Sequence, residues 1–194
     1  MKVDIFDIDG LNSLVRRAFA GLGEIKLSET SLVCVPIPET FSKIPVRIEK
    51  EHPGTSIRSV CEQVASTAEQ HGFGYNLFTA VYEAVKNAYE HGNNHNPDLP
   101  IDLAYLVGED RFDVMVQDAG GTLDPNFLAY VERYRRGEHR KQVIDFYEFS
   151  GKEKQGDNQG TGVHFMFTYL DDLFFYRSVN DGLLVHMVKL RSNP

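Results

Sequence analysis

A segment in the middle of the chain carries a carboxylate, a carboxamide and an imidazole at a spacing of four residues. These are Glu83, Asn87 and His91, and the sequence from 83 to 92 reads Glu-Ala-Val-Lys-Asn-Ala-Tyr-Glu-His-Gly. Side chains four residues apart share one face of a helix. An amide oxygen is a hard ligand for Mg²⁺, and a carboxylate beside it can accept a proton from a hydroxyl group. Taken alone, this spacing is more often that of an ordinary solvated helix face.

A second segment combines a carboxylate with glycines. The apolar run 112–116 is followed by Gln-Asp-Ala-Gly-Gly-Thr at 117–122, and then by Asp124 and Pro125. Glycine lets the backbone approach a flat ring closely, while a carboxylate can accept a hydrogen bond from an exocyclic amine. Asp118 and Gly120 are therefore candidates for contact with a nucleotide base.

A third segment, Gly160-Thr161-Gly162-Val163, precedes an apolar stretch with helical character. Free backbone amides and the helix dipole make a helix N-terminus a suitable site for phosphate groups. Either glycine segment alone would more often be a plain turn. The three segments together, in this order and on these elements, predict a nucleotide site.

These motifs resemble the histidine-kinase-like ATPase superfamily, and most closely its anti-sigma-factor serine/threonine kinases. Residues 83–88 with His91 and Gly92 resemble that family's Glu-Ala-x-x-Asn-Ala…His motif. Residues 118–125 resemble its Asp-x-Gly-x-Gly-Phe-Asp-Pro box, and residues 160–163 resemble its Gly-x-Gly-Leu box. The likeness covers roughly residues 43–190.

The resemblance implies ATP and Mg²⁺ as cofactors and a role for each candidate residue. Glu83 would be the general base, Asn87 would bind Mg²⁺, and Asp118 with Gly120 would hold the adenine. The phosphates would meet the turn formed by Gly160, Thr161, Gly162 and Val163. Residues 122–159 would form a mobile lid over ATP. The implied activity is Mg-ATP-dependent phosphorylation of a regulatory protein.

Three departures from the family pattern keep a second function open. Thr122 stands where the first box has its second glycine, His164 follows Val163, and Leu183 stands where the family often has threonine. The alternative is a non-catalytic or weakly nucleotide-binding module that sequesters its partner. In either case the partner would be a sigma factor or an anti-sigma-factor antagonist, and a homodimer is possible.

The lid is unusually basic. Its positive side chains would contact phosphate or a partner, or would simply be the solvated end of a helix; they are Arg133, Arg135, Arg136, His139, Arg140 and Lys141.

The hydrophobic pattern predicts an α+β fold with a mixed sheet and helices on one face. The resemblance implies that this fold is a two-layer α/β sandwich of the histidine-kinase-like ATPase (Bergerat) type. Strands are expected at 31–37, 44–49, 101–107, 111–117, 173–178 and 183–190. Helices are expected at 12–22, at 57–72 with a cap at Thr55 or Ser56, at 75–91, at 126–136 and at 160–170. Residues 1–42 are interpreted as a partner or dimerisation arm, and residues 43–194 as the ATP-binding domain.

Composition excludes several partner classes. The 194 residues carry a formal net charge of −8, which disfavours nucleic acid and anionic membrane surfaces. No apolar run has the ~18 residues of a membrane-spanning helix. Cys34 and Cys61, the only cysteines, are flanked by apolar residues and are predicted to be buried thiols. Together these features favour a cytoplasmic protein.

Two further motifs do not support a site. Residues 6–10, Phe-Asp-Ile-Asp-Gly, mimic the nucleophile motif of haloacid-dehalogenase-type phosphatases, but Asp4 interrupts the apolar strand that this motif needs. His91 and His95 have the spacing of metal ligands on a helix, yet no third ligand is evident.

Overall fold

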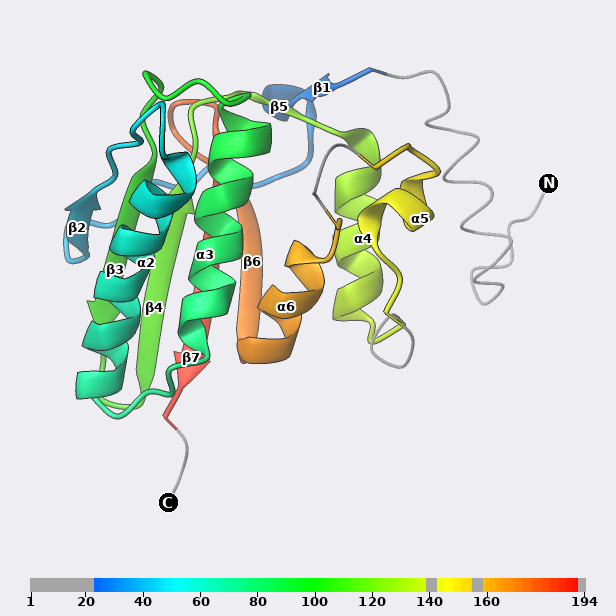
Figure 1. The fold of residues 1–194 in the computed structure, drawn as a ribbon. Coiled ribbons are helices and arrows are strands. Elements are labelled where there is room, and N and C mark those ends of the chain that lie inside the picture. Colours follow the sequence, from blue (N-terminus) through cyan, green and yellow to red (C-terminus); the bar gives the residue numbers. More distant parts are fainter. Residues whose placement is uncertain (1–22, 139–142, 155–158, 192–194) are drawn as a thin grey trace.

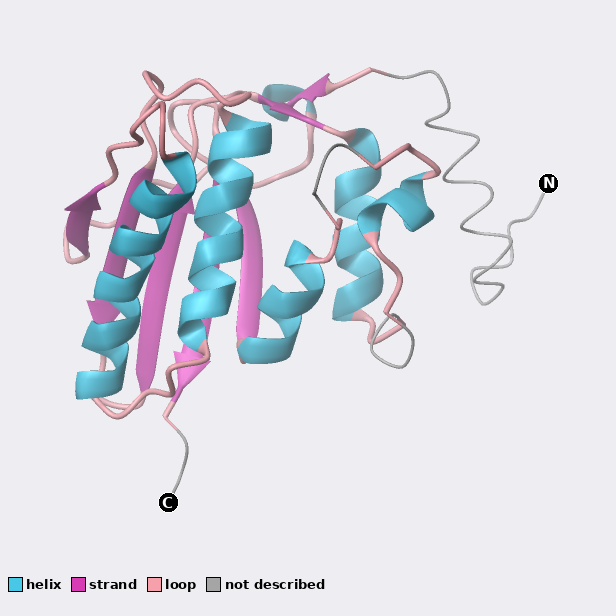
Figure 2. Ribbon diagram, viewed as in Figure 1, coloured by secondary structure: helices cyan, strands magenta, loops and turns pink. Residues whose placement is uncertain are grey.

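The computed structural model describes residues 23–138, 143–154 and 159–191. They form a five-stranded sheet with helices packed on one of its faces (Figures 1 and 2). The predicted fold class, an α+β two-layer sandwich, is confirmed. The helix predicted at 12–22 lies outside the described residues.

The sheet has the strand order β2-β3-β4-β7-β6. Its strands are β2 (Ser42–Pro45), β3 (Asp102–Val107), β4 (Arg111–Gln117), β7 (Leu183–Leu190) and β6 (Asp172–Arg177). Each neighbouring pair is antiparallel, and the two predicted hairpins, β3–β4 and β6–β7, are confirmed. Within the described residues, parallel pairing is limited to an isolated bridge between Cys34 and Arg177.

Three helices cover one face of the sheet: α2 (Pro53–Gln70), α3 (Leu77–Asn87) and α6 (Gly162–Tyr169). Their apolar stripes meet alternate residues of β4, so that Phe112, Val114 and Val116 are buried against side chains such as Val64 and Val81. Two further helices, α4 (Pro125–Arg135) and α5 (Phe146–Ser150), lie beside α6 and belong to the predicted lid.

Several helix boundaries differ from prediction, and two of the differences have a clear structural form. Helix α2 begins at Pro53 with no side-chain cap, so the predicted cap at Thr55 or Ser56 is wrong. Proline suits the first helical turn because it has no backbone N–H to leave unpaired. At the other point, α3 ends at Asn87 and continues as a π-helical turn, Ala88–Gly92.

Residues 23–41 contain less regular structure than predicted. No strand occupies 31–37, where only Cys34 forms its isolated bridge. Two short strands instead pair with each other: β1 (Ile25–Lys26) and β5 (Thr122–Leu123). A single 3₁₀ turn, η1 (Leu27–Glu29), follows β1.

Residues 35–41 cover part of the second face of the sheet. Phe41 is buried there with Ala104, Met115 and Leu184. The described part of the predicted arm therefore packs on the domain itself, and the role of residues 1–42 as a partner or dimerisation arm stays a prediction. Among the described helices, none is long and apolar enough to cross a membrane.

Candidate functional site

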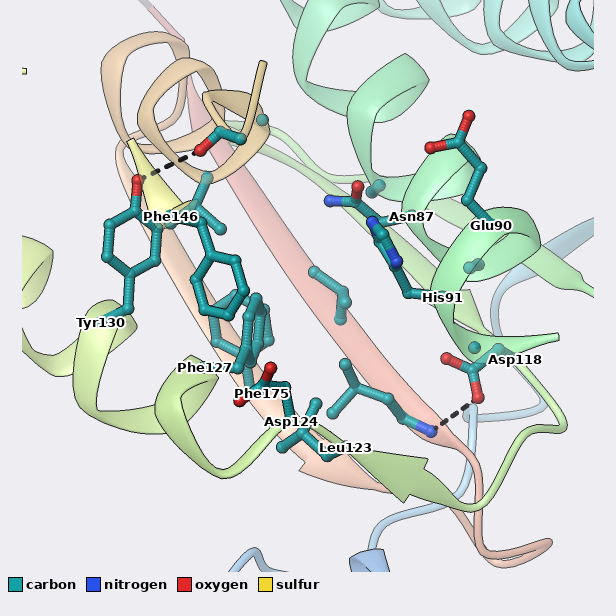
Figure 3. Close-up of a pocket in the computed structure, with 18 of the residues that line it drawn as sticks. Asn87, Glu90, His91, Asp118, Leu123, Asp124, Phe127, Tyr130, Phe146 and Phe175 are labelled. Carbon is teal, nitrogen blue, oxygen red and sulfur yellow. Dashed lines mark hydrogen bonds between the residues drawn. The ribbon is translucent and has the colours of Figure 1, made fainter. Parts of the chain in front are cut away.

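A cavity of about 380 Å³ opens beside the C-terminal end of α3. One wall is polar and includes Asn87, His91 and Asp118, whereas the opposite wall is aromatic and includes Phe127 and Phe146 (Figure 3). A flat apolar ligand with polar edges and a charged end would match these two walls.

Asp118 is buried at one end of the cavity. Its Oδ1 atom accepts hydrogen bonds from the backbone N–H groups of Gly120 and Leu183, each at 3.0 Å. Within the described part of the chain, its Oδ2 atom accepts no hydrogen bond and remains available to a ligand on the cavity side (Figure 3). Burial raises the pKa of Asp118 to about 6, although the two amide bonds oppose this rise.

Glu83, Asn87 and Gly162 come together at the other end. A Cβ atom added to Gly162 would lie 2.7 Å from Oε2 of Glu83 and 3.3 Å from Nδ2 of Asn87. Asn87 lines the cavity, while Glu83 is half-buried beside it. Burial raises the pKa of Glu83, with Lys86 lowering it and Glu90 raising it further. The third predicted segment therefore meets the first, although about 75 residues separate them.

The N-terminus of α6 carries the remaining predicted residues. Gly160, Gly162 and Val163 line the cavity, and Thr161 occupies the cap position without a side-chain cap hydrogen bond. Gly160 has a φ of +69°, a conformation that glycine adopts without strain. A Cβ atom there would lie 2.8 Å from the Tyr147 ring, so Gly160 also lets α5 approach.

Comparison with known proteins shows the family of the chain. A family model described as the histidine kinase-like ATPase domain matches residues 50–189. The chain belongs to this family. It is 30% identical over 130 residues to the serine-protein kinase RsbW of Listeria monocytogenes serotype 4a, which covers 65% of the chain and 74% of that relative. The RsbW proteins of L. monocytogenes serovar 1/2a and Listeria innocua serovar 6a are each 29% identical over the same length and shares. The predicted resemblance is confirmed.

Two glycines around Asp118 lie directly against neighbouring backbone. A Cβ atom on Gly120 would lie 1.6 Å from the carbonyl oxygen of Gly92, and one on Gly182 would lie 1.8 Å from that of Asp118. Gly120 does not line the cavity, so its close approach in this structure is to Gly92. The predicted contact between Gly120 and a base stays a prediction.

Three positively charged residues of the lid do not line the cavity. Arg133 is buried and paired with Glu138, and Arg136 pairs with Glu132. Arg135 donates to the carbonyl oxygen of Leu173 at 3.1 Å, outside the cavity. His139, Arg140 and Lys141 lie outside the described residues.

The lid nevertheless supplies a cation that sequence reasoning missed. Lys152 lines the cavity and forms an ion pair with Asp124. Asp124 in turn caps α4 by accepting from the backbone N–H of Asn126 at 2.9 Å. No pattern in the sequence distinguishes Lys152 from the other lysines of this segment.

The structure describes the contacts of all three residues that depart from the family pattern. Thr122 lies in β5 and donates to Glu24 at 2.7 Å. His164 packs its ring 5.9 Å from that of Tyr134. The backbone N–H of Leu183 donates a hydrogen bond to Asp118, a contact that any residue except proline can make.

Asn93 is a further residue that sequence reasoning missed. It is 1% exposed, its Nδ2 donates to the carbonyl oxygens of Leu99 and Pro100, and its Oδ1 accepts from the N–H of Ala119 at 2.9 Å. Asn93 thereby ties the end of α3 to the loop after Asp118. An asparagine directly after the helix-ending glycine is the available signal.

Proposed function

We propose that this protein is a Mg-ATP-dependent serine/threonine protein kinase of the anti-sigma-factor type that acts on a regulatory protein. The observation that carries the proposal is the convergence of Glu83, Asn87 and Gly162 at one end of the cavity, with Asp118 at the other. The printed name of the similar RsbW proteins, serine-protein kinase, supports the same activity.

The adenine would lie at the Asp118 end. The Oδ1 atom is already held by two backbone amides, so Oδ2 would accept from the exocyclic amine. The aromatic wall around Phe127 and Phe175, whose rings are 5.3 Å apart, would cover the apolar surface of the base.

The phosphates and Mg²⁺ would lie at the α6 end. Asn87 lines the cavity, and its side-chain oxygen is a hard donor of the kind that Mg²⁺ prefers. When bound, Mg²⁺ neutralises charge on the phosphates. The backbone N–H groups at the start of α6 and the ammonium group of Lys152 would contact the phosphate oxygens.

Glu83 would act on the protein substrate rather than on the nucleotide. Its carboxylate adjoins Gly162 but does not line the cavity, and it is only half-buried. A hydroxyl presented by a partner would lose its proton to Glu83 while its oxygen bonds to the γ-phosphorus, and the bond from that phosphorus to ADP would break. The raised pKa of Glu83 strengthens it as a base.

The test is phosphorylation of a candidate partner by wild type and by the Glu83→Gln variant. The variant keeps the shape of the side chain but cannot accept the proton, so transfer should fall by roughly 10²–10⁴-fold. Its affinity for Mg-ATP should stay within about twofold of wild type. Normal phosphorylation by the variant would refute the role of Glu83.

The alternative function, a module that binds its partner without phosphoryl transfer, draws on the departures at Thr122 and His164 and on the aromatic packing of the lid. It predicts partner binding that is indifferent to Mg-ATP. A sigma factor or an anti-sigma-factor antagonist is the proposed partner in either case. The possible homodimer and the cytoplasmic location stay predictions.

A further inference from the structure

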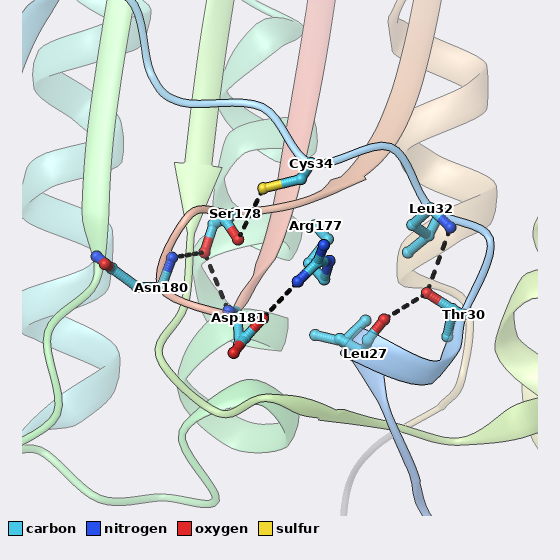
Figure 4. Close-up of polar contacts among 9 residues, drawn as sticks. Leu27, Thr30, Leu32, Cys34, Arg177, Ser178, Asn180 and Asp181 are labelled. Carbon is cyan, nitrogen blue, oxygen red and sulfur yellow. Dashed lines mark hydrogen bonds and ion pairs between the residues drawn. The ribbon is translucent and has the colours of Figure 1, made fainter.

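Residues 23–35 precede the family match, which begins at residue 50, yet they contact two loops beside Asp118. One is the loop that follows Asp118, and the other is the β6–β7 turn, whose contact Figure 4 shows. We propose that this segment is a clamp that holds the two loops in place and thereby sets the affinity of the site for nucleotide. The inference rests on the proposed function, because it assigns Asp118 to the base of ATP.

The first contact is with the loop that follows Asp118. Strand β1 pairs with β5, and the N–H of Leu27 donates to the carbonyl oxygen of Gly121 at 2.9 Å. Glu24 accepts from the hydroxyl of Thr122 at 2.7 Å and lines the cavity. This end of the clamp therefore forms part of the cavity wall.

A turn at Thr30 separates the two contacts. The Thr30 hydroxyl donates to the carbonyl oxygen of Leu27 at 2.7 Å and accepts from the N–H of Leu32 at 3.3 Å (Figure 4). Leu27 itself is 0% exposed. A buried leucine and a fixed turn hold the segment in one conformation.

The second contact is with the β6–β7 turn. Arg177 donates its N–H to the carbonyl oxygen of Val33 and accepts from the N–H of Val35, each at 2.9 Å. The thiol of Cys34 donates to the carbonyl oxygen of Ser178 at 3.5 Å. The buried Ser178 hydroxyl then accepts from the N–H of Gly182 at 3.0 Å, which shapes the turn that leads to Leu183 (Figure 4).

The two loops that the clamp contacts both lead to donors for one oxygen atom. Oδ1 of Asp118 accepts from Gly120 in the first loop and from Leu183 after the second. A segment that holds both loops therefore holds the carboxylate between them. If release of the clamp leaves the correct arrangement populated a tenth of the time, the apparent affinity falls about tenfold.

The experiment compares wild type with Leu27→Ser and Thr30→Val in the full chain. The first variant removes the buried anchor, and the second removes the hydroxyl that fixes the turn while keeping its shape. Glu29→Gln is the matched control, because Glu29 lies between them in the same segment and is exposed. Urea denaturation shows whether each variant folds. If Leu27→Ser does not fold, Thr30→Val carries the test.

Two readouts are taken: calorimetric titration of Mg-ATP, and hydrogen exchange at the amides of Gly120 and Leu183. Both variants should bind Mg-ATP at least about tenfold more weakly and exchange faster at the two amides, while Glu29→Gln matches wild type. Tight binding by both variants with unchanged exchange would overturn the clamp.

The exchange readout separates the clamp from the proposed function. If wild type itself does not bind Mg-ATP, the proposed function fails, and exchange alone decides the clamp. Faster exchange at Gly120 and Leu183 in both variants would then still support it, whereas unchanged exchange would overturn it.

Discussion

Replacing Asp118 by asparagine should stabilise the free protein while weakening its affinity for nucleotide. Asp118 is 5% exposed and has a pKa of about 6 because burial disfavours its charge. The pKa is raised in the folded state, so ionisation at neutral pH destabilises the fold, by about 3 kcal/mol for a shift of roughly two units. Asparagine keeps an acceptor for the two backbone amides and carries no charge.

The expected gain in the free energy of unfolding at pH 7.5 is about 1–3 kcal/mol, the lower value allowing for the newly buried N–H₂ group. The pH dependence gives the sharper test. Wild type should lose stability relative to Asp118→Asn as the pH rises through about 4 to 6, so the difference should grow by about 2 kcal/mol between pH 4.5 and 7.5. Urea denaturation at the two pH values measures it.

The same variant should bind Mg-ATP roughly 10–150-fold more weakly, because it loses a hydrogen bond from the adenine amine to a charged acceptor. Asp113→Asn is the control on a second buried acid. Burial raises the pKa of Asp113, but hydrogen bonds from Arg111 and His186 outweigh burial and hold this pKa below its usual value. Asp113→Asn should therefore be less stable than wild type at neutral pH. A stability difference for Asp118→Asn that is equal at both pH values would refute the argument.

Two further predictions concern backbone packing and thiol reactivity. Gly120→Ala should lower the free energy of unfolding by at least about 2 kcal/mol, because its Cβ would meet the Gly92 backbone. The control Gly54→Ala should be neutral or slightly stabilising, since nothing lies within 4 Å of the added Cβ. Equal effects of the two variants in urea denaturation would contradict this reasoning. A thiol reagent should modify only the exposed Cys34 in the native protein, since burial raises the pKa of Cys61 to about 12. Equal rates of modification at the two thiols would contradict the burial of Cys61.

Long periodic elements could be predicted from the sequence because each carries its own signal. The stripe through Val81, Ala84 and Val85 predicts α3, and alternation with tight turns predicts both hairpins. The two-residue strands β1 and β5 and the five-residue α5 are too short to show any period. Their positions depend on tertiary contacts.

Two predictions for residues before 50 are wrong for the same reason. The alternation from Ile44 to Glu49 predicts a strand, but β2 ends at Pro45 because its partner β3 begins at Asp102, opposite that residue. Apolar neighbours predict that Cys34 is buried, yet the segment runs along the sheet edge and leaves Cys34 exposed. A local pattern cannot show where a pairing partner stops.

The site could be predicted in its parts but not in its assembly. Helical spacing places Glu83 and Asn87 on one face, but only the fold brings Gly162 against them. The supporting contacts of Asn93, Glu24 and Lys152 come from segments that carry no motif. They depend on the fold, so spacing along the chain gives no sign of them.

The most direct test of the proposed nucleotide site is calorimetric titration of Mg-ATP and Mg-ADP into wild type and the Asn87→Ala variant. Asn87 lines the cavity at the point where the Mg²⁺ and phosphates are proposed to lie. We expect wild type to bind with a dissociation constant on the order of micromolar and the variant to bind at least about 100-fold more weakly, since it loses the amide oxygen proposed to hold Mg²⁺. Equal affinity of the two proteins, or no binding by wild type at millimolar nucleotide, would contradict the proposed site.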